Sequence, residues 1–199
     1  MQAEAVIIDS GGANLASLQF ALERLGARAT VSSDPRAIAA APRVLLPGVG
    51  SAADAMRRLR YSGVAQLLPT LKQPVLGICL GMQLLFERSE ECMTDCLGLV
   101  PGTVGRLRAA RGRPVPHMGW NQLLPAREDP LLEGIAPGEY FYFVHGYAAA
   151  VSPVTVAHVD YGEALSAVVR RGNFCGTQFH PERSAAAGAR LLGNFLRLS

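Results

Sequence analysis

The stretch Val75-Leu76-Gly77-Ile78-Cys79-Leu80-Gly81 joins a short apolar run to a segment of helical character. Residues 75–78 are wholly apolar, which is typical of a strand buried on both faces of a sheet. Residues 80–88 follow without a spacer, and their apolar spacing predicts a helix. A buried strand that turns directly into a helix is the repeating unit of α/β proteins, so this stretch predicts a parallel sheet.

The rest of the first half repeats this alternation. Strands are predicted at residues 5–8, 28–31 and 44–47. Residues 14–25 carry leucines at helical spacing, and Gly26 ends that helix. The first half therefore predicts parallel strands covered by helices on both faces.

The second half is richer in strand-like runs separated by turn residues. The runs are residues 102–107, 119–124, 140–144, 154–159, 164–170 and 174–179. Residues 186–198 are predicted to form a closing amphipathic helix. We therefore expect an α/β fold, with a mostly parallel sheet flanked by helices and an additional antiparallel β portion. No linker or repeat interrupts the sequence, so we expect a single domain over residues 1–199.

Composition restricts the kinds of function. Of the 199 residues, 49% are hydrophobic and 18% are charged, which is typical of a globular chain. No run of about 20 apolar residues predicts a membrane span, and the N-terminus lacks the pattern of a secretory signal. The net charge is +3 and the arginines are scattered, which does not favour nucleic-acid binding.

The four cysteines form no zinc-type pair of motifs, although Cys92 and Cys96 could share a helix face. Two such ligands without nearby histidines make a poor metal site. We therefore expect reduced thiols in a cytoplasmic protein that needs no metal and no cofactor.

The Gly-x-Cys-x-Gly pattern around Cys79 has the form of a nucleophile elbow, because it follows a buried strand and opens a helix. Glycines on each side allow the sharp turn, and the start of the helix favours a thiolate. The backbone N–H of Leu80 is then a candidate oxyanion donor. Taken alone, the pattern favours a small buried cysteine in a strand-to-helix turn, because free cysteine is often simply buried.

His180-Pro181-Glu182 supplies a candidate base and its orienting carboxylate. In an extended chain, residues two apart project on the same side, so Glu182 can reach the far ring nitrogen of His180. Cys79, His180 and Glu182 would then form a nucleophile–base–carboxylate triad. Taken singly, His180 could be a surface histidine and Glu182 a helix cap.

A second glycine-rich turn, Pro47-Gly48-Val49-Gly50, also follows a buried strand. Gly48 and Gly50 allow the backbone N–H groups of this loop to turn toward a neighbouring site, so Gly48, Val49 and Gly50 are candidate oxyanion donors. The alternative is an ordinary turn before a helix capped by Ser51.

At this point the sequence resembles the class I (triad) glutamine amidotransferases, and most closely the glutaminase subunits of imidazole glycerol phosphate synthase. The resemblance rests on residues 47–50 (Pro-Gly-Val-Gly), 77–85 (Gly-Ile-Cys-Leu-Gly-Met-Gln-Leu-Leu), 116–121 (Pro-His-Met-Gly-Trp-Asn), 141–145 (Phe-Tyr-Phe-Val-His) and 176–184 (Gly-Thr-Gln-Phe-His-Pro-Glu-Arg-Ser). These segments cover essentially the whole chain in the expected order. The third and fourth point to the subfamily.

The resemblance implies a reaction. Cys79 would attack the side-chain amide of glutamine, and His180 would take the thiol proton and pass one to the departing ammonia. Water would then hydrolyse the thioester to glutamate. Gln83 matches a position that helps to hold glutamine, and Gly146 and Tyr147 match the segment that binds its amino-acid end through the backbone. Many relatives carry a hydroxyl side chain where this sequence has Gly146, so only a backbone role is expected there.

The resemblance also implies a partner, a (β/α)₈ barrel cyclase subunit that receives the ammonia through an internal path and yields imidazole glycerol phosphate in histidine biosynthesis. The positions that match residues near that interface are Asn14, Trp120, Tyr142 and Arg183. Core packing is the alternative for Trp120 and Tyr142. The histidines outside the triad, His117, His145 and His158, are expected to be structural.

Two other functions remain open at this stage. A free-standing thiol hydrolase of the γ-glutamyl hydrolase type would turn over fully without a partner. A non-catalytic binding module on the same fold would form no thioester at Cys79. Either would use the same α/β fold, so the fold alone does not distinguish them.

Overall fold

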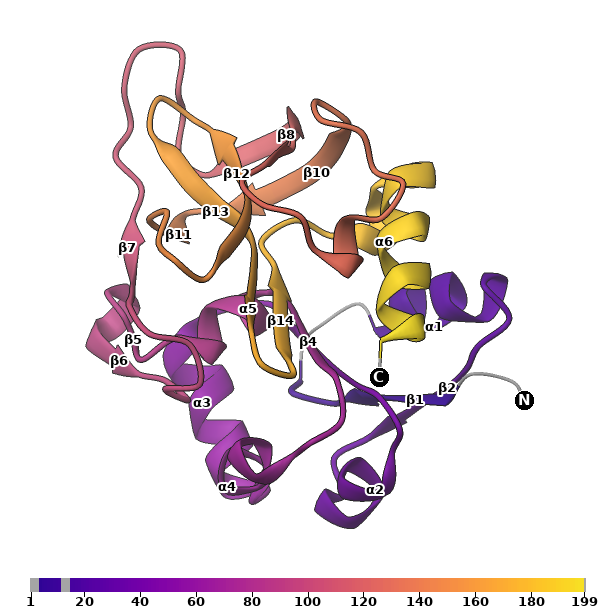
Figure 1. Cartoon of the computed structure of the whole chain (residues 1–199). Helices are drawn as coiled ribbons and strands as arrows, with labels where there is room; N and C mark the ends of the chain where they lie inside the picture. The colour runs from indigo at the N-terminus through magenta and orange to yellow at the C-terminus, as the bar shows by residue number, and fades with distance from the viewer. Residues whose placement is uncertain (1–3, 12–14, 199) are drawn as a thin grey trace.

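The central sheet of the molecule has the strand order β2-β1-β3-β4-β14-β13-β12-β9 (Figure 1). The computed structural model describes residues 4–11 and 15–198 of the chain. The first five strands in this order run parallel to one another. They are β2 (Arg28–Ser32), β1 (Glu4–Ile8), β3 (Val44–Gly48), β4 (Val75–Cys79) and β14 (Phe174–Thr177). The strands predicted from continuous apolar runs therefore form the parallel core.

Beyond β14 the pairing becomes antiparallel. The strands there are β13 (Ala164–Arg171), β12 (Thr155–Asp160) and β9 (Leu124–Pro125). A two-stranded antiparallel sheet joins β8 (His117–Gln122) to β10 (Tyr140–His145). A further sheet contains β11 (Tyr147–Ala149), β7 (Thr103–Arg106), β5 (Arg88–Ser89) and β6 (Thr94–Asp95). The α/β class with an additional antiparallel portion is confirmed.

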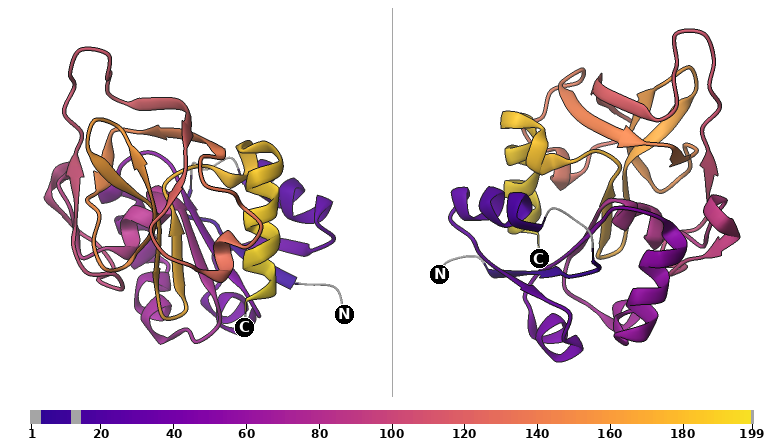
Figure 2. Two further views of the ribbon diagram at one scale, coloured as in Figure 1. Left: turned by 45° about the horizontal axis from the view of Figure 1, so that its top comes forward. Right: turned by 180° about the vertical axis from the view of Figure 1, so that it is seen from behind.

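Helices cover both faces of the parallel strands. Successive residues of a strand point to opposite faces of the sheet, so each face presents its own side chains to a layer of helices. Ile7 and Leu45 belong to the same core cluster as residues of α1 (Leu15–Arg24) and α6 (Ala185–Arg197). These two helices lie side by side in all three ribbon views (Figures 1 and 2). The other face packs against α2 (Pro35–Ala40), α3 (Ala52–Tyr61), α4 (Val64–Leu67) and α5 (Leu80–Leu85).

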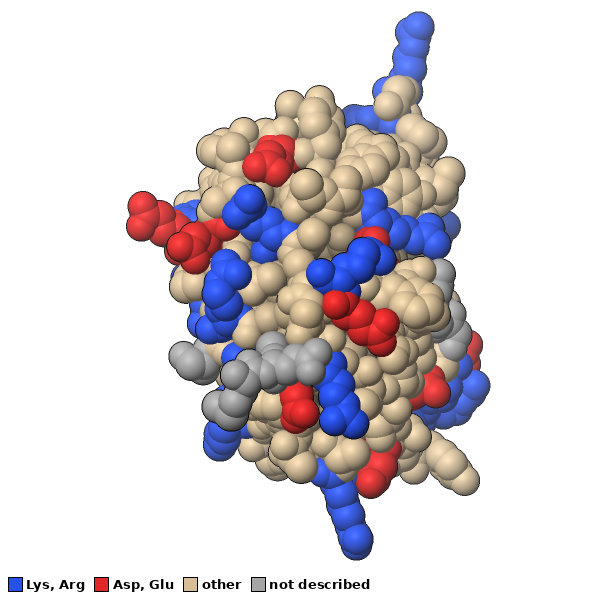
Figure 3. Space-filling view, turned by 90° about the vertical axis from the view of Figure 1, so that its right-hand side faces the viewer, with Lys and Arg blue, Asp and Glu red and all other residues tan. Residues whose placement is uncertain are grey.

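Single turns of 3₁₀ helix complete the described elements, namely η1 (Leu68–Thr70), η2 (Glu91–Met93), η3 (Pro130–Leu132) and η4 (Pro181–Arg183). Among the described residues, no helix is long and apolar enough to cross a membrane. On the face formed by the α1–α6 side of the molecule, basic and acidic side chains are interspersed (Figure 3). This face therefore carries no concentrated basic patch of the kind that binds nucleic acid.

The helix after Cys79 is shorter than the sequence predicts. It ends at Leu85 and not at residue 88, because Phe86 is extended (φ −69°, ψ 175°). The chain then enters β5, which pairs with β7, and the Leu85 carbonyl accepts from Leu99 and Val100 instead of from a further helical turn. The predicted end of this helix was wrong because pairing with β7, which is distant in sequence, places residues 88–89 in a strand.

Three other expectations differ from the structure. The strand predicted over residues 174–179 ends at Thr177. Cys92 lies in η2 and Cys96 follows β6, so the two thiols do not share a helix face. The short helices α2 and α4 were not predicted, because six and four residues are too few for a clear helical period.

Candidate active site

Cys79 stands at the sharp turn between β4 and α5. Its backbone has φ 55° and ψ −112°, a conformation that a non-glycine residue rarely adopts. A methyl group on Gly81 would lie 1.7 Å from the Leu46 carbonyl oxygen, and one on Gly77 would lie 2.6 Å from the Gly81 carbonyl oxygen. Only glycine fits at both positions. This packing holds Cys79 in a strained turn that presents its sulfur beyond the strand end.

His180 and Glu182 are joined by a hydrogen bond in which His180 Nδ1 donates to Glu182 Oε1 at 2.8 Å. The two side chains are 12% and 9% exposed, so solvent screens this ion pair only weakly. The backbone N–H of His180 donates to the Tyr142 carbonyl at 3.0 Å and fixes the position of the histidine. Since Nδ1 serves Glu182, Nε2 is the ring nitrogen left to serve Cys79.

The way in which Glu182 reaches His180 differs from the expected extended spacing. His180 itself is extended, as a residue before proline should be, but Pro181 begins the 3₁₀ turn η4. The turn brings the carboxylate back to the ring. The predicted contact is present, whereas the predicted local geometry was wrong.

The charge state of His180 is set by two opposing effects. Burial lowers the pKa of His180, but hydrogen bonds to Cys79 and Glu182 outweigh burial and raise this pKa from 6.5 to about 10. The imidazolium form therefore persists beside Cys79 at neutral pH. Glu182 Oε2 is buried and has no hydrogen-bond partner in the described part of the chain.

A cavity of about 360 Å³ opens above Cys79. It is lined by Val49, Gly50, Cys79, Leu80, Gln83, Glu91, Pro116, Val144, His145, Gly146, Tyr147 and His180. Separate stretches of the chain thus supply the walls, and most of the sequence-predicted site residues are among them. The cavity is large enough for a small amino acid.

Glu91 is a cavity residue that the sequence did not indicate. Its Oε2 accepts a hydrogen bond from the backbone N–H of Ala52 at 2.7 Å, at the start of α3. No motif surrounds Glu91, and the pairing of two distant segments brings it to the cavity. A carboxylate beside the cavity can bind a cationic group of a molecule that enters it.

The two glycine-rich turns lie next to each other because β3 and β4 are neighbours. Gly48 is the register partner of Cys79, and a methyl group on Gly48 would lie 2.9 Å from the Gly81 nitrogen. Val49 and Gly50 line the cavity, and Gly50 has φ 85°. Leu80 is the first residue of α5, whose opening N–H groups have no partner within the helix. The chain therefore presents candidate oxyanion donors on two sides of Cys79.

Gln83 lies one helical turn beyond Cys79 and is buried. Its Nε2 donates to the Tyr147 carbonyl at 2.8 Å and to Gln178 Oε1 at 3.0 Å. Gly146 and Tyr147 also line the cavity. The three residues expected to hold glutamine therefore lie together at one cavity.

The residues expected near a subunit interface lie on the β8–β10 sheet and beside the triad. Trp120 is 52% exposed, and its ring lies 6.0 Å from that of the half-buried Tyr142 on the paired strand. Core packing does not account for Trp120. Arg183 is exposed next to Glu182, and Asn14 lies outside the described residues.

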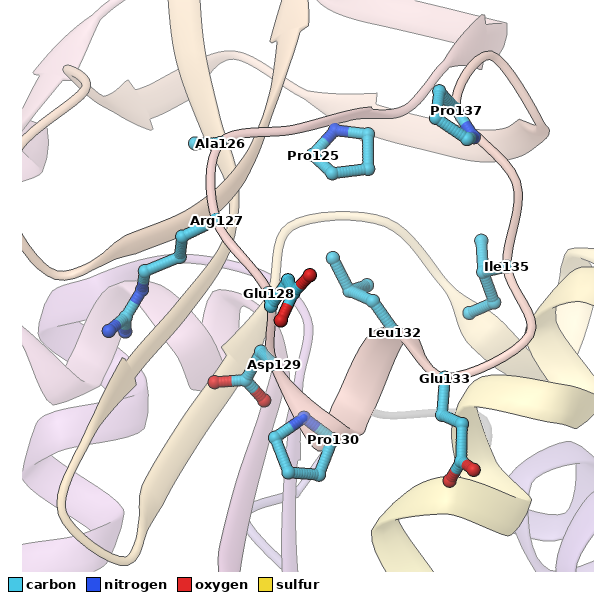
Figure 4. A pocket seen from close by; sticks show the side chains of 10 residues that line it. All are labelled: Pro125, Ala126, Arg127, Glu128, Asp129, Pro130, Leu132, Glu133, Ile135 and Pro137. Atoms are coloured by element: carbon cyan, nitrogen blue, oxygen red, sulfur yellow. The ribbon is translucent and has the colours of Figure 1, made fainter.

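A second hollow, of about 790 Å³, lies under the loop that carries η3 (Figure 4). Pro125, Leu132 and Ile135 face it, and Asp129, one of its three acidic lining residues, is paired with Arg170 at 3.2 Å. It shares no lining residue with the cavity at Cys79. We therefore assign the chemistry to the smaller cavity.

The other thiols lack the surroundings of Cys79. Burial raises the pKa of Cys96 to about 11 and that of Cys175 to about 12, which keeps both as thiols. Within residues 4–11 and 15–198, no three histidine, cysteine or acidic side chains group as metal ligands.

Known proteins are similar in sequence to this chain over nearly its whole length. Residues 6–198 match the family model for glutamine amidotransferase class-I. The chain is 56% identical over 193 residues to the imidazole glycerol phosphate synthase subunit HisH of Xanthomonas campestris pv. campestris (strain 8004), covering 97% of this chain and 96% of that protein. It is 53% identical to the protein of the same name from Xylella fastidiosa (strain Temecula1 / ATCC 700964), covering 98% of each.

Solved structures with similar folds are more distant in sequence. The crystal structure of a glutamine amidotransferase superimposes with a TM-score of 0.75 at 21% identity, covering 96% of this chain and 96% of that one. PurLQS from Thermotoga maritima gives a TM-score of 0.72 at 20% identity, covering 98% of both chains. At these identities the likeness concerns the fold alone.

Proposed function

Because the chain belongs to the class I glutamine amidotransferases, we propose that it is the glutaminase subunit of imidazole glycerol phosphate synthase in histidine biosynthesis. In this role it hydrolyses glutamine to glutamate and ammonia and passes the ammonia to a cyclase subunit. The observation that carries the proposal is the arrangement of His180, which interacts with both Cys79 and Glu182 at a cavity of amino-acid size. Similarity to the HisH relatives over 97% of the chain supports the synthase assignment.

The chemistry begins with the Cys79 thiolate and the His180 imidazolium. The sulfur attacks the amide carbon of glutamine, and His180 Nε2 gives its proton to the departing nitrogen, which leaves as ammonia. Water then attacks the thioester carbonyl carbon, with His180 as the base. The carbon–sulfur bond breaks, glutamate departs, and the proton on His180 again faces the thiolate. Glu182 holds the ring through Nδ1 and stabilises its positive charge.

The tetrahedral intermediate carries its negative charge on oxygen. We assign this oxygen to the N–H of Leu80, at the start of α5, and to the N–H groups of residues 48–50, of which Val49 and Gly50 line the cavity. Gly48, Val49 and Gly50 thus act as one wall of the oxyanion site, and Leu80 acts as the other.

Glutamine is held at its two ends by different groups. Both amide hydrogens of Gln83 are used inside the protein, so its carbonyl oxygen is the atom left to bind substrate. The backbone of Gly146 and Tyr147 binds the amino-acid end. Glu91 provides the negative charge for the substrate ammonium group.

The cyclase subunit, which is a (β/α)₈ barrel in the family, docks on the exposed side of the β8–β10 sheet. Met118, Trp120 and Tyr140 are 67%, 52% and 54% exposed there, and together they form an apolar surface beside Tyr142. Arg183, which is exposed next to Glu182, belongs to the same interface. Exposed aromatic side chains of this kind are enriched at protein–protein interfaces.

The test of the proposed function is a mixture of the purified chain with the cyclase subunit, glutamine and the nucleotide intermediate. We expect glutamate release to rise strongly when the cyclase and its ligand are added. Equal release without the cyclase would favour a free-standing thiol hydrolase. No covalent adduct at Cys79 on treatment with a glutamine-like electrophile would favour a non-catalytic module.

Cys79→Ala provides the matched control. It should abolish synthesis from glutamine and leave synthesis from added ammonia intact, because the cyclase needs only the ammonia. Loss of both reactions would contradict the assigned role of Cys79.

A further inference from the structure

The buried amide of Gln83 has an orientation that its neighbours determine. The Tyr147 carbonyl oxygen can only accept, so the Gln83 atom 2.8 Å from it must be the amide nitrogen. That nitrogen also lies 3.0 Å from the amide of Gln178, where it must meet an oxygen. The side-chain oxygen of Gln178 therefore faces Gln83.

The same reasoning fixes the other end of Gln178. With its oxygen committed to Gln83, its Nε2 faces Cys79 and lies 3.9 Å from the sulfur. Gln178 is fully buried, so no water competes for this N–H group. An amide donor thus points at the reacting sulfur from inside the protein, on a residue to which nothing above assigns a role.

The Tyr147 carbonyl that begins this chain of hydrogen bonds is itself held by a second donor. His145 Nδ1 lies 2.9 Å from it and must carry the proton, which leaves Nε2 as an acceptor. His117 Nδ1 then donates to His145 Nε2 at 3.0 Å, and Asn121 Nδ2 donates to His117 Nε2 at 3.2 Å. Each side chain in this network therefore has one assignment of donors and acceptors that satisfies all of its contacts. The network runs from β8 to Gln178 and is consistent with a single orientation of the Gln178 amide.

We propose that Gln178 is a further catalytic residue, whose amide N–H stabilises the negative charge on the Cys79 sulfur. The proposal rests on the proposed function, in which Cys79 forms and releases a thioester. The sulfur regains its negative charge when water breaks the thioester. A donor aimed at the sulfur therefore favours release of glutamate, because hydrogen bonds to charged groups are the stronger ones. Gln83, His145 and His117 act as positioning residues for this donor.

The main alternative is that Gln178 only orients Gln83 for substrate binding. The two roles predict opposite changes in KM. Loss of a sulfur donor slows hydrolysis of the thioester, so kcat falls, KM stays equal or falls, and thioester accumulates. Loss of an orienting residue weakens glutamine binding, so KM rises and thioester does not accumulate.

The experiment compares Gln178→Met with the wild-type chain in complex with the cyclase subunit and its nucleotide ligand. We expect kcat for glutamate release to fall roughly tenfold, the fold-change of one lost charge-assisted hydrogen bond. We also expect intact-mass measurement to show a larger share of γ-glutamyl thioester at steady state. A raised KM with no added thioester would overturn the proposal.

Gln83→Met is the comparison variant. Gln83 lines the substrate cavity, so we expect this substitution to raise KM; because Gln83 also positions Gln178, kcat should fall too, but by less than in Gln178→Met. Gln178→Glu, assayed at pH 8.5 to favour the carboxylate, is the second variant. It retains the oxygen that Gln83 needs but has no amide N–H. Wild-type kcat in Gln178→Glu would also overturn the proposal. A wild-type chain that forms no thioester would instead reject the proposed function.

Discussion

Glu182 illustrates how one side chain sets the chemistry of its neighbour. Its Oε1 binds His180 Nδ1, and this contact, with that to Cys79, opposes the effect of burial and raises the pKa of His180 to about 10. A raised histidine pKa means that the charged form is lost only as the pH rises through that value. Above it, His180 no longer carries the proton that departing ammonia requires.

Glu182→Gln should therefore change the pH dependence of the reaction. Removing the negative charge lowers the pKa of His180, so the alkaline limb of kcat/KM should move to lower pH by about one unit. We expect kcat to fall roughly tenfold to 100-fold, because the ring loses its orienting anion. The measurement is glutamine hydrolysis in the complex between pH 6 and 10. Glu133→Gln, an exposed acid elsewhere, should leave the profile as it is; an unmoved limb in Glu182→Gln contradicts this account.

The close packing around Gly81 leads to a second prediction. A methyl group there would meet the Leu46 carbonyl oxygen at 1.7 Å, and a backbone atom cannot move aside as a flexible side chain can. We expect Gly81→Ala to reduce the free energy of unfolding by roughly 3 kcal/mol or more and to abolish glutamine hydrolysis. Denaturant unfolding measures the first effect.

Gly193→Ala serves as the control for Gly81→Ala. It lies in α6, and apart from the backbone of that helix the nearest atom to the added methyl group is Arg197 Nη1 at 3.7 Å, so it should be neutral or slightly stabilising. Equal effects of the two substitutions would contradict a role for close packing at the elbow.

Residues differ in how far the sequence alone could identify them. Cys79, His180 and Glu182 stand in short motifs whose spacing indicates their chemistry, and the structure brings the three together. Glu91 and Gln178 carry no such local signal. Glu91 reaches the cavity because β5 pairs with β7, and Gln178 reaches the Cys79 sulfur because β14 lies beside β4. Pairings of distant segments are not visible in local periodicity.

At the scale of elements, the same limit explains where helices and strands were misjudged. The β strands of the parallel core were predicted to within one or two residues at each end, because buried strands have a strong apolar signal. The helix α5 was predicted three residues too long, since only pairing with β7 pulls residues 88–89 into a strand. Local pattern identifies an element, whereas tertiary contacts determine its end.

The β8–β10 sheet carries a buried histidine pair that should make the fold sensitive to acid. Burial lowers the pKa of His117 to about 4 and that of His145 to about 4. In the unfolded chain both histidines have a pKa near 6.5. At pH values between about 4 and 6.5 the unfolded state therefore binds more protons than the folded state. Stability is therefore fully present above pH 6.5 and is lost as the pH falls toward 4.

His145→Gln should remove part of this dependence. Near pH 5.5 the slope of unfolding free energy against pH should become shallower by about 1 kcal/mol per pH unit, the effect of one histidine that is protonated only when unfolded. Denaturant titrations between pH 5 and 7.5 give this slope. His158→Gln, on β12, is the comparison variant, and an identical slope in His145→Gln and the wild type contradicts the prediction.

At the scale of the whole molecule, the cavity is assembled from separate parts of the chain that meet at the carboxyl ends of β3, β4 and β14. The exposed side of the β8–β10 sheet lies next to this region, because the His180 backbone bonds to Tyr142 on β10. An apolar surface beside the proposed source of ammonia is where a partner that receives ammonia would dock. The aromatic residues of this surface should therefore contribute to binding rather than to folding.

Trp120→Ala tests that statement. The side chain is 52% exposed, so its removal should change the free energy of unfolding by less than about 0.5 kcal/mol. Removal of an aromatic residue at the centre of an interface should instead weaken binding of the cyclase subunit about thirtyfold, or about 2 kcal/mol. The Kd is measured by calorimetric titration of the two subunits. Tyr61→Ala is the control, because Tyr61 is 95% exposed at the end of α3, at the opposite end of the molecule from β8 and β10 (Figure 1). If both variants bind the cyclase as the wild type does, the partner docks elsewhere. If Tyr61→Ala alone weakens binding, the interface is at α3.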